Sequence, residues 1–148
     1  MNNVETQKFN TKDIKTILRM QRTWAEGNIT YGYTPYTEKE CFDRLSDYSL
    51  VAEIEGEIVG FVFGSVHESN NMAVIPTGRL YLEIDDIYIA KTYRYKGIGS
   101  ILLDRIMQVA HDYAIENFLL YSANTNIEQL LKFYKSHGFK SWWIRMYK

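Results

Sequence analysis

The chain has 148 residues, 46% of them hydrophobic, and a formal net charge of −1. This length and apolar fraction fit a single domain with one core, which we expect to span residues 1–148. The near-zero charge gives no bulk electrostatic argument for nucleic acid or a membrane as a partner. The one cysteine, Cys41, cannot form an internal disulfide, and no apolar stretch resembles a signal peptide or membrane span, so we expect a cytoplasmic protein.

Four segments predict helices, either by the spacing of their apolar residues or by a capping signal. They are residues 12–26, a short helix that begins after Thr37, residues 97–116 and residues 127–137. The short helix carries a capping box, because Glu40 stands three residues after Thr37. Gly138 ends the last helix at the position where helices prefer glycine.

Runs of β-branched and aromatic residues predict the strands, which we place at residues 4–9, 50–54, 58–66, 80–90, 118–122 and 139–146. The second and third runs are joined by Glu55-Gly56-Glu57, which is a hairpin signal. The resulting order is β-α-α-β-β-β-α-β-α-β. It predicts an α+β fold with a mixed, largely antiparallel sheet flanked by helices, and one parallel crossover around the helix at residues 97–116.

The stretch YRYKGIGSILL places two glycines and two cations at the start of a predicted helix. The first N–H groups of a helix have no intrahelical partner, and the aligned peptide dipoles add partial positive charge there. Gly97 and Gly99 let the backbone approach an anion closely, and Arg94 and Lys96 add charge beside it. The pattern favours a phosphate or pyrophosphate cradle, although a tight strand-to-helix turn with surface charges explains it equally well.

Two motifs together make the chain resemble a known family. Arg94, Gly97 and Gly99 match R-x-x-G-x-G after a strand, and residues 133–139 match F-Y-x-x-x-G-F. In both motifs and in element order, the chain is similar to the GNAT superfamily of N-acetyltransferases. The resemblance implies acetyl-CoA as co-substrate, no metal, and direct transfer of the acetyl group to an amine.

The resemblance also implies how acetyl-CoA would be held. Its pyrophosphate would lie on the N–H groups of residues 94–99, and its pantetheine arm would pair with the strand that ends near Ile89, between two splayed strands. The residues expected to contact it are Ile87, Tyr88, Ile89, Arg94, Tyr95, Lys96, Gly97, Ile98, Gly99, Ser100, Asn126 and Phe133. Leu130 or Leu131 replaces an alanine common in the family, which would narrow the cleft.

This chemistry needs an acid and a base. Tyr134 matches the tyrosine of F-Y-x-x-x-G-F, which implies that it protonates the leaving thiolate. Glu83, Asp85 and Asp86 interrupt an apolar strand, and each is a candidate for the base, with Asp85 slightly preferred. On a regular strand Glu83 and Asp85 share one face and Asp86 points the other way, whereas a bulge would bring Asp86 in. The three carboxylates also suit a cationic acceptor, as an alternative to solvated or ion-paired surface groups.

Aromatic residues supply two further expectations. Tyr31, Tyr33 and Tyr36 either belong to a tyrosine-rich core and surface or, as the resemblance implies, wall the acceptor pocket. Trp142 and Trp143 alternate on the last predicted strand, so one should pack inward and the other outward, in a homodimer contact or against the acceptor.

We therefore expect an N-acetyltransferase that acts on a primary amine of a small molecule or peptide. One alternative is a non-catalytic acyl-CoA-binding module that regulates or senses. A second is a phosphate-binding domain of another class, in which the glycine motif is coincidental.

Overall fold

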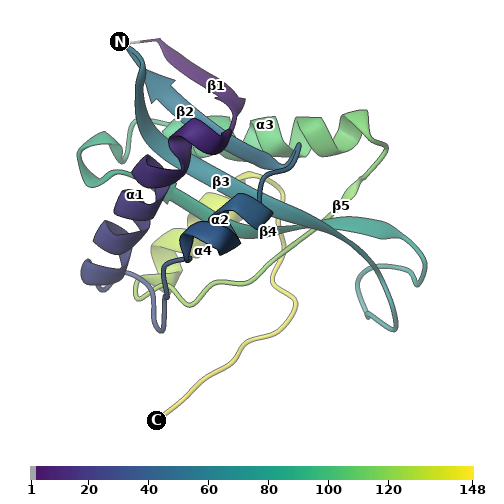
Figure 1. The fold of residues 1–148 in the computed structure, drawn as a ribbon. Coiled ribbons are helices and arrows are strands. Elements are labelled where there is room, and N and C mark those ends of the chain that lie inside the picture. Colours follow the sequence, from purple (N-terminus) through teal and green to yellow (C-terminus); the bar gives the residue numbers. More distant parts are fainter. Residues whose placement is uncertain (1–2) are drawn as a thin grey trace.

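A computed structural model describes residues 3–148 and places five strands in one sheet, in the order β1-β2-β3-β4-β5 (Figure 1). The strands are β1 (Val4–Lys8), β2 (Ser49–Ile54), β3 (Glu57–Glu68), β4 (Leu80–Ile89) and β5 (Asn117–Leu120). Neighbours from β1 to β4 are antiparallel, and β4 and β5 are parallel. The expected α+β class and largely antiparallel sheet are confirmed.

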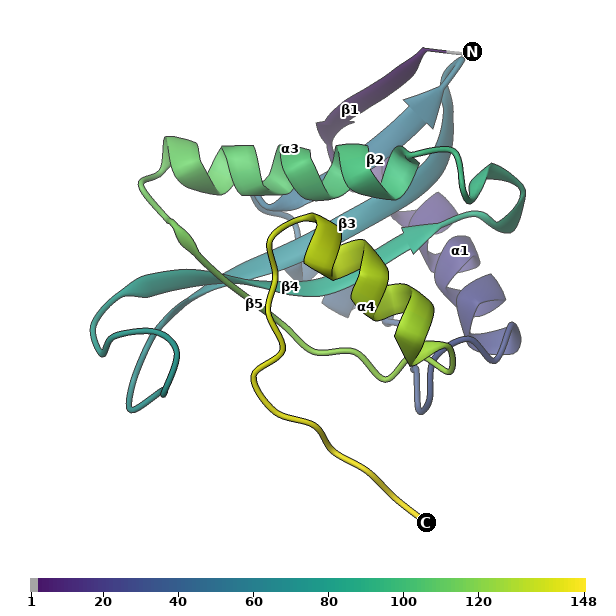
Figure 2. The same cartoon turned by 180° about the vertical axis from the view of Figure 1, so that it is seen from behind.

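Helices cover both faces of this sheet. They are α1 (Ile14–Glu26), α2 (Glu38–Asp43), α3 (Ile98–Asp112) and α4 (Ile127–Ser136), with short 3-10 turns η1 (Thr11–Asp13) and η2 (Lys91–Tyr93). Figure 1 shows α1 and α2 on one face, and Figure 2 shows α3 and α4 on the other. Each face therefore has its own buried apolar cluster.

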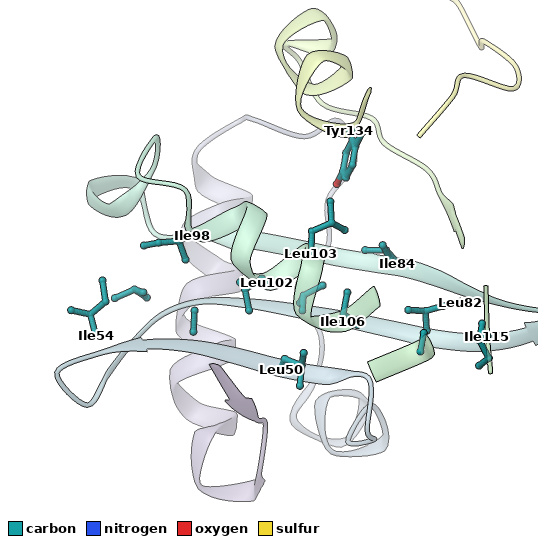
Figure 3. Close-up of a cluster of buried hydrophobic side chains, with 14 residues drawn as sticks. Leu50, Ile54, Leu82, Ile84, Ile98, Leu102, Leu103, Ile106, Ile115 and Tyr134 are labelled. Atoms are coloured by element: carbon teal, nitrogen blue, oxygen red, sulfur yellow. The ribbon is translucent and has the colours of Figure 1, made fainter. Parts of the chain in front are cut away.

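The two clusters fix the helices by burying their apolar stripes. Leu102, Leu103 and Ile106 of α3 are fully buried against the sheet (Figure 3). On the opposite face, Ile17 and Trp24 of α1 belong to the other buried cluster, which includes Phe61 and Phe63 of β3. The burial of apolar surface on both sides makes the central strands the rigid part of the molecule.

Local capping explains where the helices begin and end. The capping box is present at α2, where the side chains and backbones of Thr37 and Glu40 bond reciprocally. Helix α3 ends at Asp112 rather than at the expected residue 116, because Ala114 adopts a left-handed φ of 60° and Ile115 N–H bonds back to Ala110.

The expected last strand is absent from the described residues. Residues 139–148, the C-terminal tail, have no regular structure and run away from the body of the protein (Figure 2). Trp142 and Trp143 are 40% and 55% exposed, so the expectation that one of them packs inward is wrong. After Gly138, which has a left-handed φ of 88°, Phe139 packs on Tyr134 of α4, and no sheet hydrogen bond joins the rest of the tail to β5 in the described structure.

Strand β4 has two irregularities that shape the site. Phe63 of β3 pairs with Asp86 and the next residue, Gly64, pairs with Ile84, so Asp85 is an extra, bulged residue. On its other edge β4 pairs with β5 only from Tyr81 to Ile84, although β4 continues to Ile89. The backbone edge of β4 after Ile84 is therefore left open toward β5.

Candidate active site

A cleft of about 360 Å³ opens where β4 and β5 separate, between the first turn of α3 and helix α4. Most of the residues expected to contact the cofactor line it: Ile87, Ile89, Arg94, Tyr95, Gly97, Ile98, Gly99, Ser100, Asn126 and Phe133. Asn124, Gln129 and Leu130 also line the cleft. Of these three, the sequence had indicated only Leu130, as a residue that narrows the cleft. The cleft thus gathers segments that are widely separated in the chain.

Tyr88 and Lys96 were also expected in the cleft but do not line it. The Tyr88 side chain points to the opposite face of the sheet, where it is buried and stacks on Trp24 with ring centroids 5.1 Å apart. The Lys96 ammonium lies 5.6 Å from the centroid of the Tyr93 ring. Tyr88 therefore has only its backbone available to a ligand on the cleft side.

The turn before α3 has the backbone geometry of an anion cradle. Gly97 has a φ of 83° and Tyr95 a φ of 62°, so left-handed residues flank Lys96. Helix α3 makes its first internal bond from Ile101 N–H to Gly97 carbonyl oxygen at 3.1 Å, which leaves the preceding N–H groups without intrahelical partners. A Cβ atom on Gly97 would meet no atom within 4 Å, so this side of the turn is open.

Arg94 fastens this turn to the end of β4. Its Nε donates to the Ile89 carbonyl oxygen at 2.8 Å, and its guanidinium lies over the Tyr88 ring at 5.3 Å. The side chain therefore orders the cradle while it places a fixed positive charge beside it.

A chain of side-chain hydrogen bonds ties α4 to α3 beside the cleft. Ser100 Oγ lies 2.9 Å from His137 Nε2, and His137 Nδ1 lies 3.0 Å from Asp104 Oδ1. Phe133 adds an edge contact to the His137 ring and lies 3.4 Å from the position of a Cβ on Gly99. These contacts set the spacing of α3 and α4. Sequence reasoning missed His137 and Asp104, because residues 33 and 37 positions apart give no joint signal.

Tyr134 lies inside the same cleft. It is 8% exposed, and its hydroxyl points from α4 toward Leu103 of α3 (Figure 3). Burial raises the pKa of Tyr134 to about 12. The hydroxyl therefore keeps its proton at neutral pH and is a donor rather than a base.

The bulge in β4 brings all three strand carboxyl groups together on the α1–α2 face. Asp85 Oδ2 accepts from Arg44 Nη1 at 2.6 Å and from Ser65 Oγ at 2.9 Å. Asp86 accepts a hydrogen bond from the Tyr36 hydroxyl. The geometry expected of a regular strand, with Asp86 on the other face, therefore does not apply. The structure contains the alternative in which a bulge brings Asp86 in, because the extra residue reverses the alternation.

Glu83 completes this group, which we call the acidic cluster (Glu83, Asp85 and Asp86). Its Oε2 lies 3.4 Å from His67 Nε2, and its pKa is raised by burial and further by the neighbouring Asp85. Burial also raises the pKa of Asp86, while the hydrogen bond from Tyr36 opposes part of that rise. The two carboxyl groups thus hold protons more readily than ordinary surface acids do.

Tyr31, Tyr33 and Tyr36, which the sequence groups in one loop, lie in two different surroundings. Tyr36 stacks on Phe63 and its backbone N–H donates to Gln21 Oε1 at 2.8 Å, so it is fixed above Asp86. Tyr33 stacks on Trp24 with a centroid distance of 3.9 Å. Burial raises the pKa of Tyr33, and the nearby Asp86 carboxylate raises it further. Tyr31 is 58% exposed and lies away from this pair. Two of the three tyrosines therefore lie beside the acidic cluster.

The part of the chain that the structure describes contains no group of three or more His, Cys, Asp or Glu side chains able to hold a metal ion. Among its helices, none has the length and apolar character needed to cross a bilayer.

Comparison with known proteins agrees with this geometry. The family model of the acetyltransferase (GNAT) family matches residues 12–139. An N-alpha-acetyltransferase of Sulfurisphaera tokodaii is 24% identical over 132 residues, which cover 86% of this chain and 75% of that protein. A family match over most of the chain excludes a coincidental motif in a phosphate-binding domain of another class.

Two solved structures share the fold. A predicted acetyltransferase with acetyl-CoA from Clostridium acetobutylicum has a TM-score of 0.72 at 20% identity, with 98% of this chain and 96% of that chain covered. An aminoglycoside acetyltransferase in complex with sisomicin, from an uncultured soil metagenomic sample, has a TM-score of 0.73 at 17% identity, covering 98% and 95%.

Substitution of Gly97 tests the cradle. Gly97→Asp should weaken acetyl-CoA binding more than about 10-fold in calorimetry, because a carboxylate would stand against the pyrophosphate. Gly78→Asp is a matched control, since Gly78 also has a positive φ, of 89°, and no atom within 4 Å of an added Cβ. Near-native affinity in Gly97→Asp, or an equal loss in Gly78→Asp, would contradict the cradle.

Proposed function

The chain belongs to the acetyltransferase (GNAT) family, and on that basis we propose that it transfers an acetyl group from acetyl-CoA directly to a primary amine of a small molecule or peptide. One observation carries this proposal. The opened edge of β4 has a cleft with an anion cradle and Tyr134 on one face, and the acidic cluster on the other face. The two reactants of an acetyl transfer would therefore meet at the same short strand segment.

The cleft residues fit acetyl-CoA by charge and by backbone chemistry. The N–H groups at the start of α3 would donate hydrogen bonds to the pyrophosphate, with Arg94 adding positive charge in the cleft. The unpaired edge of β4 between Asp85 and Ile89 offers N–H and carbonyl groups for the amides of the pantetheine arm. When bound, acetyl-CoA supplies a thioester whose carbonyl carbon is open to an amine.

Asp86 is the proposed base. An alkylammonium is not a nucleophile, so one proton has to leave the amine before its nitrogen forms the new C–N bond. Asp86 stands just past the last β4–β5 pair, and its raised pKa makes its carboxylate a better proton acceptor than an ordinary aspartate. Asp85, the earlier preference, is occupied by Arg44 and Ser65, and we assign it the role of holding the bulge.

Tyr134 is the proposed acid. As the C–S bond breaks, negative charge collects on sulfur, and the Tyr134 hydroxyl donates first a hydrogen bond and then its proton to that atom. A hydroxyl whose burial keeps it protonated is available for this donation throughout the neutral range. The ammonium loses two protons in all. Asp86 takes the first and passes it to solvent, and the second, which leaves the nitrogen after the C–N bond forms, replaces the proton that Tyr134 gives to the thiolate.

The acceptor is proposed to be a cationic amine. The acidic cluster has three carboxyl groups and one neighbouring guanidinium, that of Arg44, and Tyr33 and Tyr36 supply aromatic surface beside them. Such a site suits a ligand with several ammonium groups, as carboxylates and aromatic rings both attract cations. The structural neighbour crystallised with sisomicin is consistent with this class of acceptor.

The proposal is tested by thiol release from acetyl-CoA with a panel of amines: a polyamine, an aminoglycoside, a peptide N-terminus and a neutral amide as control. We expect release that depends on an amine and is fastest with the polycations. Tight, CoA-selective binding without release for any amine would instead support the non-catalytic acyl-CoA module.

Asp86→Asn separates base catalysis from structure. We expect kcat/KM to fall by about 10²-fold or more and its acidic limb, which reports ionisation of the base, to disappear. Because burial raises the Asp86 pKa in the folded state, its ionisation removes stability as pH rises through that pKa, so Asp86→Asn should raise Tm at pH 7.5. Asp85→Asn is the control, because it weakens the Arg44 ion pair and should lower Tm. An unchanged pH profile in Asp86→Asn would exclude Asp86 as the base.

Tyr134→Phe tests the acid. The ring keeps its packing against Phe133 and Phe139, so acetyl-CoA affinity and Tm should change little. We expect kcat to fall by about 10- to 10³-fold with the amine KM nearly constant, because the lost proton donor acts only as the thiolate leaves. Tyr48→Phe serves as the control, because Tyr48 packs on Tyr113 and does not line the cleft. A Tyr134→Phe enzyme with native kcat would move this role to water.

A further inference from the structure

His137 links the cleft to solvent through two hydrogen bonds. It directly follows α4, and its ring lies between Ser100 and Asp104, which are four positions apart and therefore share one face of α3. The His137 side chain is 12% exposed, whereas that of Asp104 is 65% exposed. Ser100 lines the cleft. A largely covered imidazole thus has a carboxylate on its solvent side and a hydroxyl on its cleft side.

The two partners determine where the proton of the neutral His137 ring lies. An ionised carboxylate only accepts hydrogen bonds, so Nδ1, which is 3.0 Å from Asp104 Oδ1, has to carry the ring proton. Nε2 is then an acceptor, and the Ser100 hydroxyl donates the hydrogen bond of 2.9 Å between them. A serine hydroxyl has a single hydrogen. While His137 is neutral, Ser100 can therefore present only oxygen lone pairs to the cleft, and these repel phosphate oxygens.

Protonation of His137 reverses the direction of the bond to Ser100. Both nitrogens of an imidazolium are donors, so Nε2–H donates to Ser100 Oγ and the serine hydrogen is free to turn toward the cleft. Ser100 belongs to the first turn of α3, the turn whose N–H groups form the anion cradle. The freed hydroxyl would add one more donor to that cradle.

The other charged groups near His137 are of types that keep their charge around neutral pH. Asp104 is the acidic side chain within 4 Å of the ring in residues 3–148. The cations on neighbouring segments are Arg94 and Lys96 before α3, Lys132 and Lys135 on α4, and Lys140 in the tail. Histidine is the side chain whose charge ordinarily changes between pH 5 and 8. A change of affinity for an anion over this range would therefore report on His137.

We propose that His137 is a positioning residue that couples the binding of acetyl-CoA to the uptake of a proton. The imidazolium turns the Ser100 hydroxyl toward the pyrophosphate, and the neutral ring turns it away, while Asp104 keeps Nδ1 protonated in both forms. This inference rests on the proposed binding of acetyl-CoA in the cleft. Affinity for the cofactor should rise as the pH falls, whereas base catalysis by Asp86 should weaken.

Calorimetry with dephospho-CoA tests the coupling. This ligand keeps the pyrophosphate but lacks the 3′-phosphate, a monoester that would itself take up a proton near pH 6. We expect binding about 10-fold tighter at pH 6 than at pH 8, in line with one added hydrogen bond to a charged group. Binding heats in buffers of different ionisation enthalpy should show uptake of part of a proton at pH 7. Equal affinity at both pH values, or proton release, would overturn the inference. Absence of binding at every pH would contradict the proposed function as well.

Substitutions at Ser100 separate the hydroxyl switch from a simple link between helices. Ser100→Ala should lose most of the pH dependence of dephospho-CoA binding, because no hydroxyl remains to be turned. Ser100→Thr keeps a hydroxyl and should retain the dependence. If Ser100→Ala weakened binding by the same factor at pH 6 and pH 8, the contact with His137 would be only structural, and the proposal would be wrong.

His137→Gln removes the titrating group and keeps a polar side chain. We expect one affinity for dephospho-CoA from pH 6 to pH 8, because an amide takes up no proton in this range. His111→Gln is the matched control, since His111 is an exposed histidine of α3 whose ring contacts Phe118 and does not line the cleft. It should keep the full pH dependence. Native pH dependence in His137→Gln, or its loss in His111→Gln, would assign the proton to another group.

Discussion

The separation of the parallel strands β4 and β5 after a few paired residues determines where the cleft and the residues that line it lie. β4 and β5 are hydrogen-bonded only up to Ile84 and Leu120, and beyond that point β4 keeps its other neighbour, β3. Its backbone therefore stays rigid while one edge is free, which is a rare condition for a central strand because unpaired buried backbone groups are costly. The cleft, the anion cradle and Tyr134 all lie along that free edge.

The bulge at Asp85 gives neighbouring carboxyl groups different roles. Without the extra residue, Asp86 would point into the apolar cluster under α3, where an unpaired carboxylate is expensive. With it, both side chains lie on the opposite face of the sheet, where Asp85 pairs with Arg44 and Asp86 accepts a hydrogen bond from the Tyr36 hydroxyl. A single inserted position thus separates a structural ion pair from a carboxyl group that can exchange its proton.

Local features of the fold were predictable from sequence, and distant pairings were not. The capping box at Thr37, the hairpin around Gly56 and the glycine turn at Gly97 depend on neighbouring residues, and the structure contains them. Arg44 and Asp85 are 41 positions apart, so their contact depends on how α2 packs on the sheet. The tail was wrongly assigned as a strand of this chain's own sheet, because composition shows strand propensity but not which edge is available.

The acidic cluster and Arg44 together carry a formal charge of −2, whereas the whole chain carries −1, so the remaining residues sum to +1. This part of the α1–α2 face is therefore locally negative although the molecule is nearly neutral. Its field draws cations to the α1–α2 face, while Arg94 and Lys96 draw anions to the α3–α4 face. Reactants of opposite sign would approach without competing for one entrance, and their encounter rates would both fall as added salt shortens the Debye length.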